Sequence, residues 1–184
     1  MSARMKEYIL QAAGDLFAKQ GFNSTSVDNI AAQAQVAKVT LYKYYKSKEL
    51  LIIEYLKTQD QKLWKKLSET TQQETALAEL EMHITTLLDV INDKDFKGFA
   101  SLHAGMEFPE LENPVNQTSK EFSKQLREQI SDLAIKAGVK SANALAMQLA
   151  LVVEGASISQ RNQTSNDSIV HAKSLVKTLI NAAI

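Results

Sequence analysis

Cysteine is absent from this 184-residue sequence, and the chain has only two prolines and six glycines. The lack of cysteine excludes disulfide bonds and thiolate metal sites, and it is typical of proteins in a reducing compartment. No segment has the roughly 18 unbroken apolar residues of a membrane span. The N-terminus reaches Arg4, Lys6 and Glu7 before any apolar run, so we expect no signal peptide. The sequence therefore predicts a cytoplasmic protein without a membrane partner.

Motifs typical of enzymes are also missing. The sequence has no P-loop, no G-x-S-x-G, no H-E-x-x-H and no cysteine nucleophile. Its three histidines, at positions 83, 103 and 171, do not share a catalytic spacing. Glu79 with His83, and His103 with Glu107, are four residues apart, which is more typical of a pair on one helix face than of a metal site. We expect no enzymatic activity, no cofactor and no metal site.

Positive charge is concentrated near the N-terminus, although the net charge of the chain is zero. Residues 1–57 contain eight Lys or Arg and five Asp or Glu, whereas the rest of the chain contains 13 and 16. Within this part, residues 38–49 (KVTLYKYYKSKE) hold four lysines and three tyrosines. Because an unpaired ammonium group is costly to bury, much of this segment should lie at the surface. The asymmetry indicates that one part of the protein meets a polyanion.

Apolar residues recur with helical spacing along the chain, and no convincing period-two alternation occurs. We therefore predict an all-α fold of about nine helices. Pro109 and Pro114 form the one strong breaker cluster of the second half, and Pro114 opens a long helix that Gly138 ends. The longest predicted helices lie near 4–20, 47–68, 75–92, 113–136 and 141–162, with a shorter one near 96–107.

Residues 25–46 have the features of two short helices joined by a tight turn. Thr25 is expected to cap the first helix, in a capping-box-like arrangement with Asp28. Ala31 and Ala34 are small enough for the two helices to cross closely. With the preceding helix as a brace, this is the layout of a helix-turn-helix, whose second helix enters the DNA major groove.

The second short helix has distinct inner and outer faces. Leu41 and Tyr45 are four residues apart and are expected to face the core. The polar and basic residues of the outer face are Lys38, Thr40, Lys43 and Lys46. The pattern indicates a surface that could contact DNA, although lysines on a short helix also occur on ordinary solvated faces.

Three motifs in register span about fifty residues of this region. They read IL-x-AA-x(3)-F-x(3)-GF at 9–22, TSV-x-x-IA-x-x-A-x-V at 25–36 and TLY-x-YYKSKE-x-L at 40–51. The motifs resemble the N-terminal part of the TetR family of bacterial repressors. The second half is similar to that family only in helical layout and in the element EFP at 107–109, followed by Pro114.

The resemblance implies two domains and a set of DNA contacts. The domains would be a three-helix, helix-turn-helix DNA-binding domain at 1–46 and a helical ligand-sensing and dimerisation domain at 47–184. Four of the implied contacts approach base edges and four bind phosphates; the first group is Lys38, Val39, Thr40 and Lys43, and the second is Thr25, Tyr42, Tyr44 and Lys48. A helix N-terminus independently favours an anion near Lys48.

Two positions depart from the family pattern. Ala37 stands where serine is frequent, which removes a cap and a possible phosphate contact. Val39 stands where glycine is frequent, and its branched side chain could meet a thymine methyl group or hold the helix slightly back. The sequence therefore leaves the DNA preference open.

The last two helical segments are apolar over wide faces. From Ser141, the sequence SANALAMQLALVVEGASIS is apolar or small around most of the helix. We predict that these helices pair with the same helices of a second copy in a four-helix bundle, as the resemblance also implies. The predicted interface residues are Leu145, Leu149, Val152, Ala156, Ile169, Leu175, Val176 and Leu179.

The resemblance also implies a pocket for an unidentified small-molecule effector. Its candidate residues are Trp64, Met82, His83, Phe96, Phe99, His103, Met106 and Phe108. The predicted function is a ligand-responsive repressor that binds a palindromic operator in double-stranded DNA as a homodimer and is released by an inducer. The alternative is a dimeric helical protein-binding module whose helix-turn-helix no longer reads DNA, which Ala37 and Val39 keep open.

Overall fold

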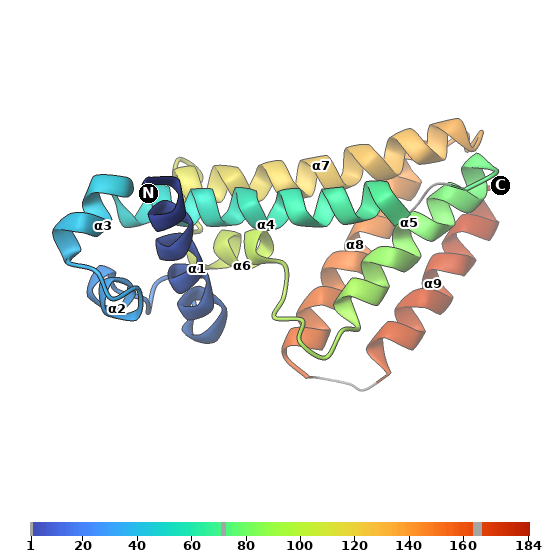
Figure 1. Cartoon of the computed structure of the whole chain (residues 1–184). Coiled ribbons are helices and arrows are strands. Elements are labelled where there is room, and N and C mark those ends of the chain that lie inside the picture. Colours follow the sequence, from blue (N-terminus) through green and yellow to red (C-terminus); the bar gives the residue numbers. More distant parts are fainter. Residues whose placement is uncertain (1, 71–72, 164–166) are drawn as a thin grey trace.

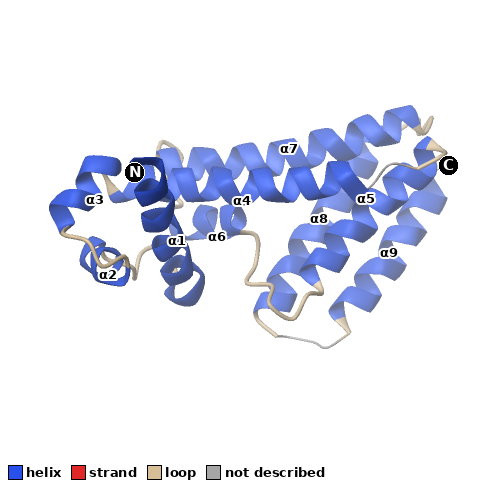
Figure 2. Cartoon of the chain, viewed as in Figure 1, coloured by secondary structure: helices blue, strands red, loops and turns tan. Residues whose placement is uncertain are grey.

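The computed structural model describes residues 2–70, 73–163 and 167–184, and within these ranges it contains nine α-helices and no β-strand (Figures 1 and 2). The predicted all-α fold of about nine helices is confirmed. The helices are α1 (Ser2–Gln20), α2 (Val27–Gln33), α3 (Lys38–Tyr44), α4 (Lys48–Thr70), α5 (Ala76–Ile91), α6 (Ala100–Glu107), α7 (Pro114–Lys136), α8 (Ala142–Arg161) and α9 (Ser168–Ala183).

The molecule is elongated, with α1–α3 at one end and α5, α8 and α9 at the other (Figure 1). The first three helices share a small hydrophobic core, in which Ile30 of α2 and Leu41 of α3 are fully buried. Phe17 of α1 packs on Phe22 with ring centroids 5.0 Å apart. Gly21 lies between these two residues in sequence, and its φ of 85° is a conformation that glycine adopts without strain. The predicted end of the first helix at this glycine is confirmed.

Helix α4 runs along the molecule beside α7 and contributes to both cores (Figure 1). Leu51, Ile52 and Leu56 of its first half pack with α1–α3, whereas Leu67 near its end packs with the C-terminal helices. Helix α4 therefore connects the two cores directly. The division into domains at 46 and 47 stays a prediction.

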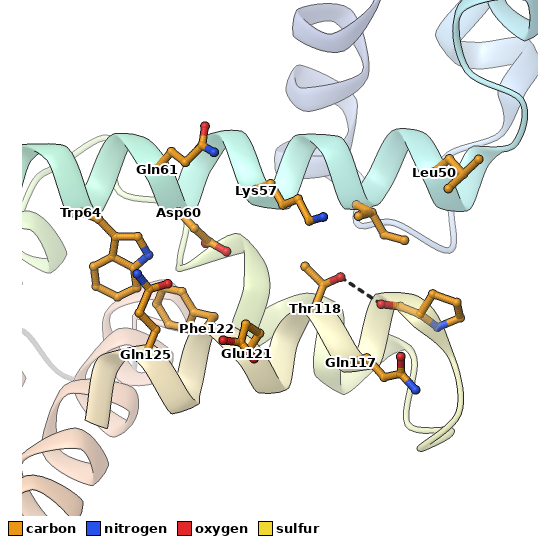
Figure 3. Close-up of a pocket in the computed structure, with 12 residues that line it drawn as sticks. Leu50, Lys57, Asp60, Gln61, Trp64, Gln117, Thr118, Glu121, Phe122 and Gln125 are labelled. Carbon is orange, nitrogen blue, oxygen red and sulfur yellow. Dashed lines mark hydrogen bonds between the residues drawn. The ribbon is translucent and has the colours of Figure 1, made fainter. Parts of the chain in front are cut away.

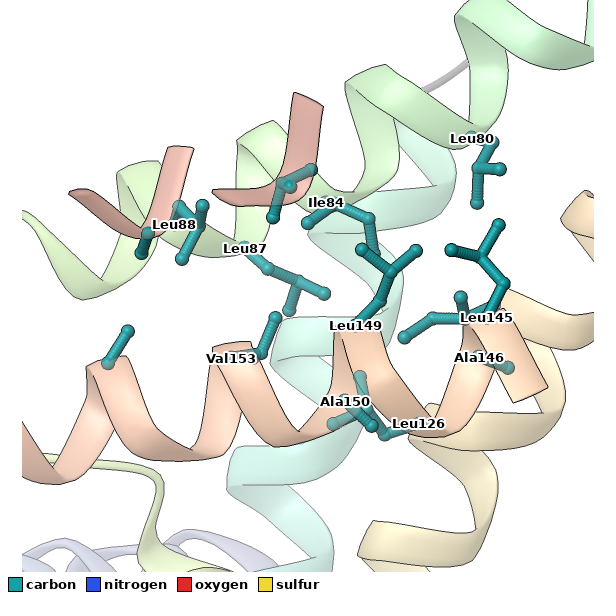
Figure 4. Close-up of a cluster of buried hydrophobic side chains, with 14 of the residues drawn as sticks. Leu80, Ile84, Leu87, Leu88, Leu126, Leu145, Ala146, Leu149, Ala150 and Val153 are labelled. Carbon is teal, nitrogen blue, oxygen red and sulfur yellow. The ribbon is translucent and has the colours of Figure 1, made fainter. Parts of the chain in front are cut away.

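The C-terminal core is built where α5, α7, α8 and α9 meet. Leu145 and Leu149 of α8 face Ile84 and Leu87 of α5, and Leu126 comes from α7 (Figure 4). All five are at most 2% exposed. Each buried leucine or isoleucine side chain stabilises the fold by about 1.5–3 kcal/mol relative to exposure.

Five of the eight predicted interface residues lie on the buried faces of α8 and α9. Leu145, Leu149 and Ala156, with Ile169 and Val176 of α9, pack inside the chain's own core. The sequence showed that α8 is apolar on two sides but not which side faces inward, so the prediction included residues of the inward face. By length and composition α8 is also apolar enough to cross a membrane, but part of its apolar surface, including Leu145 and Leu149, lies in the bundle core, as in the core helices of other helical proteins.

Helix α6 begins later than the sequence indicates. The prediction placed its start near Phe96, but the helix starts at Ala100 after an irregular segment in which Gly98 has a φ of 93°. Phe96 and Phe99 contact each other edge to face, 5.3 Å between centroids. These aromatic rings produced the apparent helical spacing.

Candidate DNA-binding surface and effector cavity

A tight turn with a defined backbone conformation joins α2 to α3. Gln35 adopts a φ of 50°, and the amide of Val36 donates to the carbonyl of Ala31 at 3.0 Å. Ala31 and Ala34 are both buried where the helices meet. This is the predicted helix-turn-helix arrangement, and it fixes the direction in which α3 projects.

Thr25 does not play the predicted capping role. Ser26 is the N-cap of α2, and it forms a reciprocal capping box in which the Asn29 amide donates to its hydroxyl at 3.0 Å and its own amide donates to Oδ1 of Asn29 at 3.2 Å. Thr25 is fully buried, and its hydroxyl donates to the Gly21 carbonyl at 2.7 Å. A side chain used in this way does not reach a phosphate, so the predicted contact of Thr25 is corrected as well.

The outer face of α3 combines exposed apolar and basic side chains. Val39 is 81% exposed, the highest value among the large hydrophobic residues of the described chain. Tyr42 and Lys43 are also exposed, and Thr40 is partly exposed. Leu41, between them in sequence, is fully buried and holds the helix against the core. The face that the sequence assigned to base contacts is therefore accessible.

Lys38, the first residue of α3, is already paired. Its ammonium lies 2.9 Å from a carboxylate oxygen of Asp28 on α2. The hydrogen bond to Asp28, and then its negative charge, raise the pKa of Lys38. Ala37, the N-cap of α3, makes no side-chain capping hydrogen bond. To contact DNA, Lys38 must therefore break its ion pair with Asp28 and bind a base or a phosphate instead.

The three tyrosines of the basic segment have different surroundings. Tyr45 is buried, its hydroxyl donates to the Lys6 carbonyl at 3.2 Å, and burial followed by the charge of Glu54 raises its pKa to about 12. Tyr44 is partly buried against the same core. Tyr42 is 42% exposed. The expected inward position of Tyr45 is confirmed, and Tyr42 is the tyrosine best placed for an external contact.

Lys48 opens α4 close to the turn after α1. Its ammonium donates to the carbonyl of Asn23 at 3.4 Å. Burial lowers the pKa of Lys48, and the nearby Glu107 raises it in opposition. The amide of Leu50 donates to the hydroxyl of Ser47 at 3.1 Å, so Ser47 caps this helix as expected. The N-terminus of α4 thus combines a cation with the positive end of a helix dipole, a combination that favours a phosphate.

Glu107, the last residue of α6, bridges the two parts of the molecule. Its carboxylate accepts hydrogen bonds from the backbone amides of Phe22 at 3.0 Å and Asn23 at 2.7 Å. The side-chain amide of Asn23 donates in return to the Glu107 carbonyl at 2.9 Å. Such bonds to a charged acceptor are stronger than neutral ones. Glu107 therefore ties α6 to the turn before α2, a role that its helical spacing from His103 does not indicate.

A cavity of about 710 Å³ lies between α4 and α7 (Figure 3). Of the eight predicted pocket residues, only Trp64 lines it. Trp64 stacks on Phe122 of α7 with centroids 5.2 Å apart and ring planes 26° apart. The remaining wall is a mixture of apolar and polar side chains: Leu50, Ile53, Lys57, Asp60, Gln61, Pro114, Gln117, Thr118, Glu121 and Gln125.

The other predicted pocket residues are dispersed over the structure. His83 lines a second cavity of about 590 Å³, which also reaches Trp64, and burial lowers its pKa to about 4. Phe96 and Phe99 line a third, of about 390 Å³. His103 is buried near Gly98 and Arg161, and burial is the main cause of its pKa of about 4. The structure therefore does not bring the eight candidate residues together in one cavity, and their contact with a ligand stays a prediction.

Three predicted pocket residues line none of these cavities. Met82 and Met106 are 37% and 56% exposed on the surface. Phe108 packs against the N-terminal core. Aromatic and methionine residues at helical spacing fill cores and surfaces as often as pockets, so the pattern could not separate these cases.

Asp60 is a charged residue of this cavity that was not among the predicted pocket residues. It lies on α4 in the same helical stripe as the apolar residues Ile53, Leu56, Leu63 and Leu67. A carboxylate in such a stripe was the available signal. Both of its oxygens accept from the hydroxyl of the fully buried Ser101 on α6, at 2.9 and 2.8 Å.

Comparison with known sequences connects this geometry to a family. The family model described as "Bacterial regulatory proteins, tetR family" matches residues 9–55. The chain is 26% identical over 154 residues to the HTH-type transcriptional regulator YuxN of Bacillus subtilis, covering 83% of this chain and 52% of that protein, so it spans about half the length of this relative. It is 37% identical over 65 residues to the HTH-type transcriptional regulator QacR of Staphylococcus aureus, covering 34% of this chain and 35% of that one.

Solved structures share the fold over nearly the whole length. SCO4454, a TetR-family transcriptional regulator from Streptomyces coelicolor, superposes with a TM-score of 0.91 at 21% identity, covering 98% of this chain and 96% of the other. A TetR-family regulator from Cytophaga hutchinsonii gives a TM-score of 0.86 at 16% identity, with 99% and 96% covered. At these identities the similarity establishes the fold alone.

Proposed function

Because the chain belongs to the TetR family of bacterial regulatory proteins, we propose that it is a cytoplasmic, ligand-responsive repressor that binds a palindromic operator as a homodimer. The observation that carries this proposal is the outer face of α3. Val39 and Lys43 project from it while Leu41 anchors it from behind. A helix anchored in this way can enter the major groove while its inner face stays packed on the core.

The proposed contacts divide between base edges and phosphates. Val39, Thr40 and Lys43 face the groove, with Lys38 joining them after it leaves Asp28. Tyr42 and Lys48 hold the backbone, and Tyr44 contributes its hydroxyl from a partly buried position. Val39, which is 81% exposed, supplies an apolar contact suited to a thymine methyl group.

The proposed second copy of the chain covers the outward faces of α8 and α9. Met147, Leu151 and Ile158 of α8 are 47%, 59% and 39% exposed, and Leu175 of α9 is 48% exposed. Leu151, Gly155 and Leu175 line one groove between the two helices. A Cβ added at Gly155 would meet nothing within 4 Å, so the groove has room for a close helix from a partner. These side chains replace the five core residues of the predicted interface, and Val152, Leu175 and Leu179 remain in it.

The proposed control by ligand acts through α4 and α6. A ligand between α4 and α7 can tilt α4, whose first half carries the core of the DNA-binding end. Helix α6 offers a second connection, because Ser101 binds Asp60 and Glu107 binds the turn at Phe22 and Asn23. A ligand changes operator affinity only if it prefers one of the two arrangements.

A footprint of the purified protein on the promoter regions beside its own gene tests this function. We expect a protected palindrome whose half-site centres lie about one helical turn or a multiple of it apart. If no promoter fragment is protected, the proposal is contradicted and the protein-binding module is favoured. Two observations motivate that alternative: α3 begins at Ala37 without a side-chain cap, and Lys38 is paired with Asp28.

A further inference from the structure

The cavity between α4 and α7 has an aromatic wall made by Trp64 and Phe122 (Figure 3). The indole nitrogen of Trp64 is buried, and no hydrogen-bond partner for it occurs in the described part of the chain. A buried donor without a partner is costly, but it calls for an acceptor and so does not by itself select a cation; the aromatic faces of this wall are what bear on charge. The cavity volume, about 710 Å³, suits a small organic molecule.

Two carboxylates face the same cavity from opposite helices, Asp60 from α4 and Glu121 from α7 (Figure 3). Asp60 is bound by the hydroxyl of Ser101, and neither carboxylate forms an ion pair within residues 2–70, 73–163 and 167–184. Lys57 is the one basic residue of the lining, and it is exposed. The lining therefore carries more negative than positive charge.

The carboxylate of Asp60 is held without a compensating cation. Burial raises its pKa to about 6, although the hydrogen bond from Ser101 acts in the opposite direction. A desolvated carboxylate favours a cation as its next partner and disfavours an anion. The aromatic faces of Trp64 and Phe122 favour a cation for the same electrostatic reason.

We propose that this cavity binds an organic cation whose charge lies between Asp60 and Glu121 and whose apolar body packs on Trp64 and Phe122. The inference rests on the proposed function, since this cation would be the effector of the repressor. By drawing Asp60 away from Ser101, it would loosen one end of α6, whose other end holds the DNA-binding part through Glu107.

The neighbouring cavity is less suited to such a ligand. It shares Trp64, but Lys65 and Lys136 line it together with a single carboxylate, that of Asp132. Its net positive lining does not select a cation. Asp132 lines this neighbouring cavity, so its replacement is the matched control for the replacement of Asp60 or Glu121.

Trp64 is the single tryptophan of the chain, so its fluorescence reports on the cavity directly. Tetraphenylphosphonium and tetraphenylborate are probes of nearly equal shape and opposite charge. Titrated into the full-length protein at pH 7.5, the cation is expected to change the fluorescence saturably, and the anion is expected to bind at least about tenfold more weakly. Asp60→Asn and Glu121→Gln should each weaken the cation, the first by at least about tenfold because its charge is desolvated. Asp132→Asn should leave the affinity unchanged.

Equal affinity for the two probes, or unchanged cation affinity in both Asp60→Asn and Glu121→Gln, would overturn the inference. A loss in Asp132→Asn instead would place the cation in the neighbouring cavity and would also overturn it. Operator binding without any probe is measured in parallel on the same samples. If operator binding persists while the cation fails to bind, only this inference fails; if the cation binds and no operator is found, the proposed function fails.

Discussion

The carboxylate of Glu107 accepts a 2.7 Å hydrogen bond from the backbone amide of Asn23, 84 residues earlier in the chain. Its second oxygen accepts from the amide of Phe22. Lys48 donates to the carbonyl of Asn23 from the other side. One residue of the turn before α2 is thus held by α6 and by α4 at once, which places the proposed phosphate contact and the proposed ligand control on the same short segment.

Glu107→Gln is expected to weaken this connection. A glutamine offers one acceptor where the carboxylate offers two, and its amide group faces a donor, so we expect a loss of about 1–3 kcal/mol in the stability of the turn. Native-state hydrogen exchange should show faster exchange at the amides of Phe22 and Asn23, and unchanged exchange in the α8 core. The control is Glu110→Gln, an exposed glutamate three residues on. Equal exchange in both variants would contradict the role of Glu107.

Lys43→Ala and Lys48→Ala are expected to differ in their effect on DNA. Lys43 is exposed on α3 and is proposed to contact bases, so its removal should change the preference among operator variants by about 1–3 kcal/mol. Lys48, at the start of α4, is proposed to contact a phosphate, so its removal should weaken all duplexes alike. Binding to a panel of single-base operator variants and to random DNA separates the two. A uniform loss in both proteins would remove Lys43 from the base contacts.

Leu151→Glu is expected to convert the proposed dimer to a monomer. Leu151 is 59% exposed on α8, so a carboxylate there stays hydrated in the single chain but would be buried against a partner. Ile135→Glu on α7 is the matched control, because Ile135 is 60% exposed and lies outside the α8 and α9 groove. Sedimentation velocity of the two variants at equal concentration gives the oligomeric state. The proposal fails if Leu151→Glu remains a dimer or if the parent chain is a monomer.

Asp60→Asn is expected to stabilise the fold at neutral pH. The pKa of Asp60 rises from 3.8 to about 6 on folding, so the ionised group opposes folding fully above pH 6, and the opposition falls as the pH drops through 6 toward 4. Discounted for the part of the side chain near solvent, the penalty at pH 7.5 is on the order of 1–3 kcal/mol. Urea unfolding should show this gain at pH 7.5 and a smaller one at pH 4.5.

The control for Asp60→Asn is Glu121→Gln, which neutralises the exposed carboxylate of the same cavity. We expect Glu121→Gln to leave the unfolding free energy nearly unchanged at both pH values. If Asp60→Asn were destabilising at pH 7.5, or if its effect did not depend on pH, Asp60 would be a satisfied structural residue and not a group kept for a ligand.

Local sequence signals were sufficient for most of the helices, though not for the start of α6, and for the inner face of α3. Gly21, the Pro114 start and the Leu41–Tyr45 spacing each act within one or two turns of chain, so they predict structure without knowledge of the rest. The cap of α2 was misplaced by one residue because Thr25 and Ser26 are both competent caps. Only the hydrogen bond from the Thr25 hydroxyl to the Gly21 carbonyl decides between them.

The cavities and the subunit face could not be predicted in the same way. Whether Leu149 or Leu151 faces inward depends on the rotation of α8 against α5 and α7, which involves residues far apart in sequence. The contacts of Glu107 with Phe22 and of Asp60 with Ser101 span 85 and 41 residues. Periodicity carries no information on such pairs, although the carboxylate in the apolar stripe of α4 did mark Asp60 as unusual.

A salt titration can show whether the chain reads DNA through α3. The affinity is measured at rising salt for the footprinted operator and for a random duplex of equal length. We expect a tighter complex with the operator and a steep fall in affinity as salt rises, with a slope of about 0.9 per phosphate neutralised. Lys48→Ala should reduce that slope by about one. Equal affinities for the two duplexes, or an affinity that does not change with salt, would contradict the reading of DNA through α3.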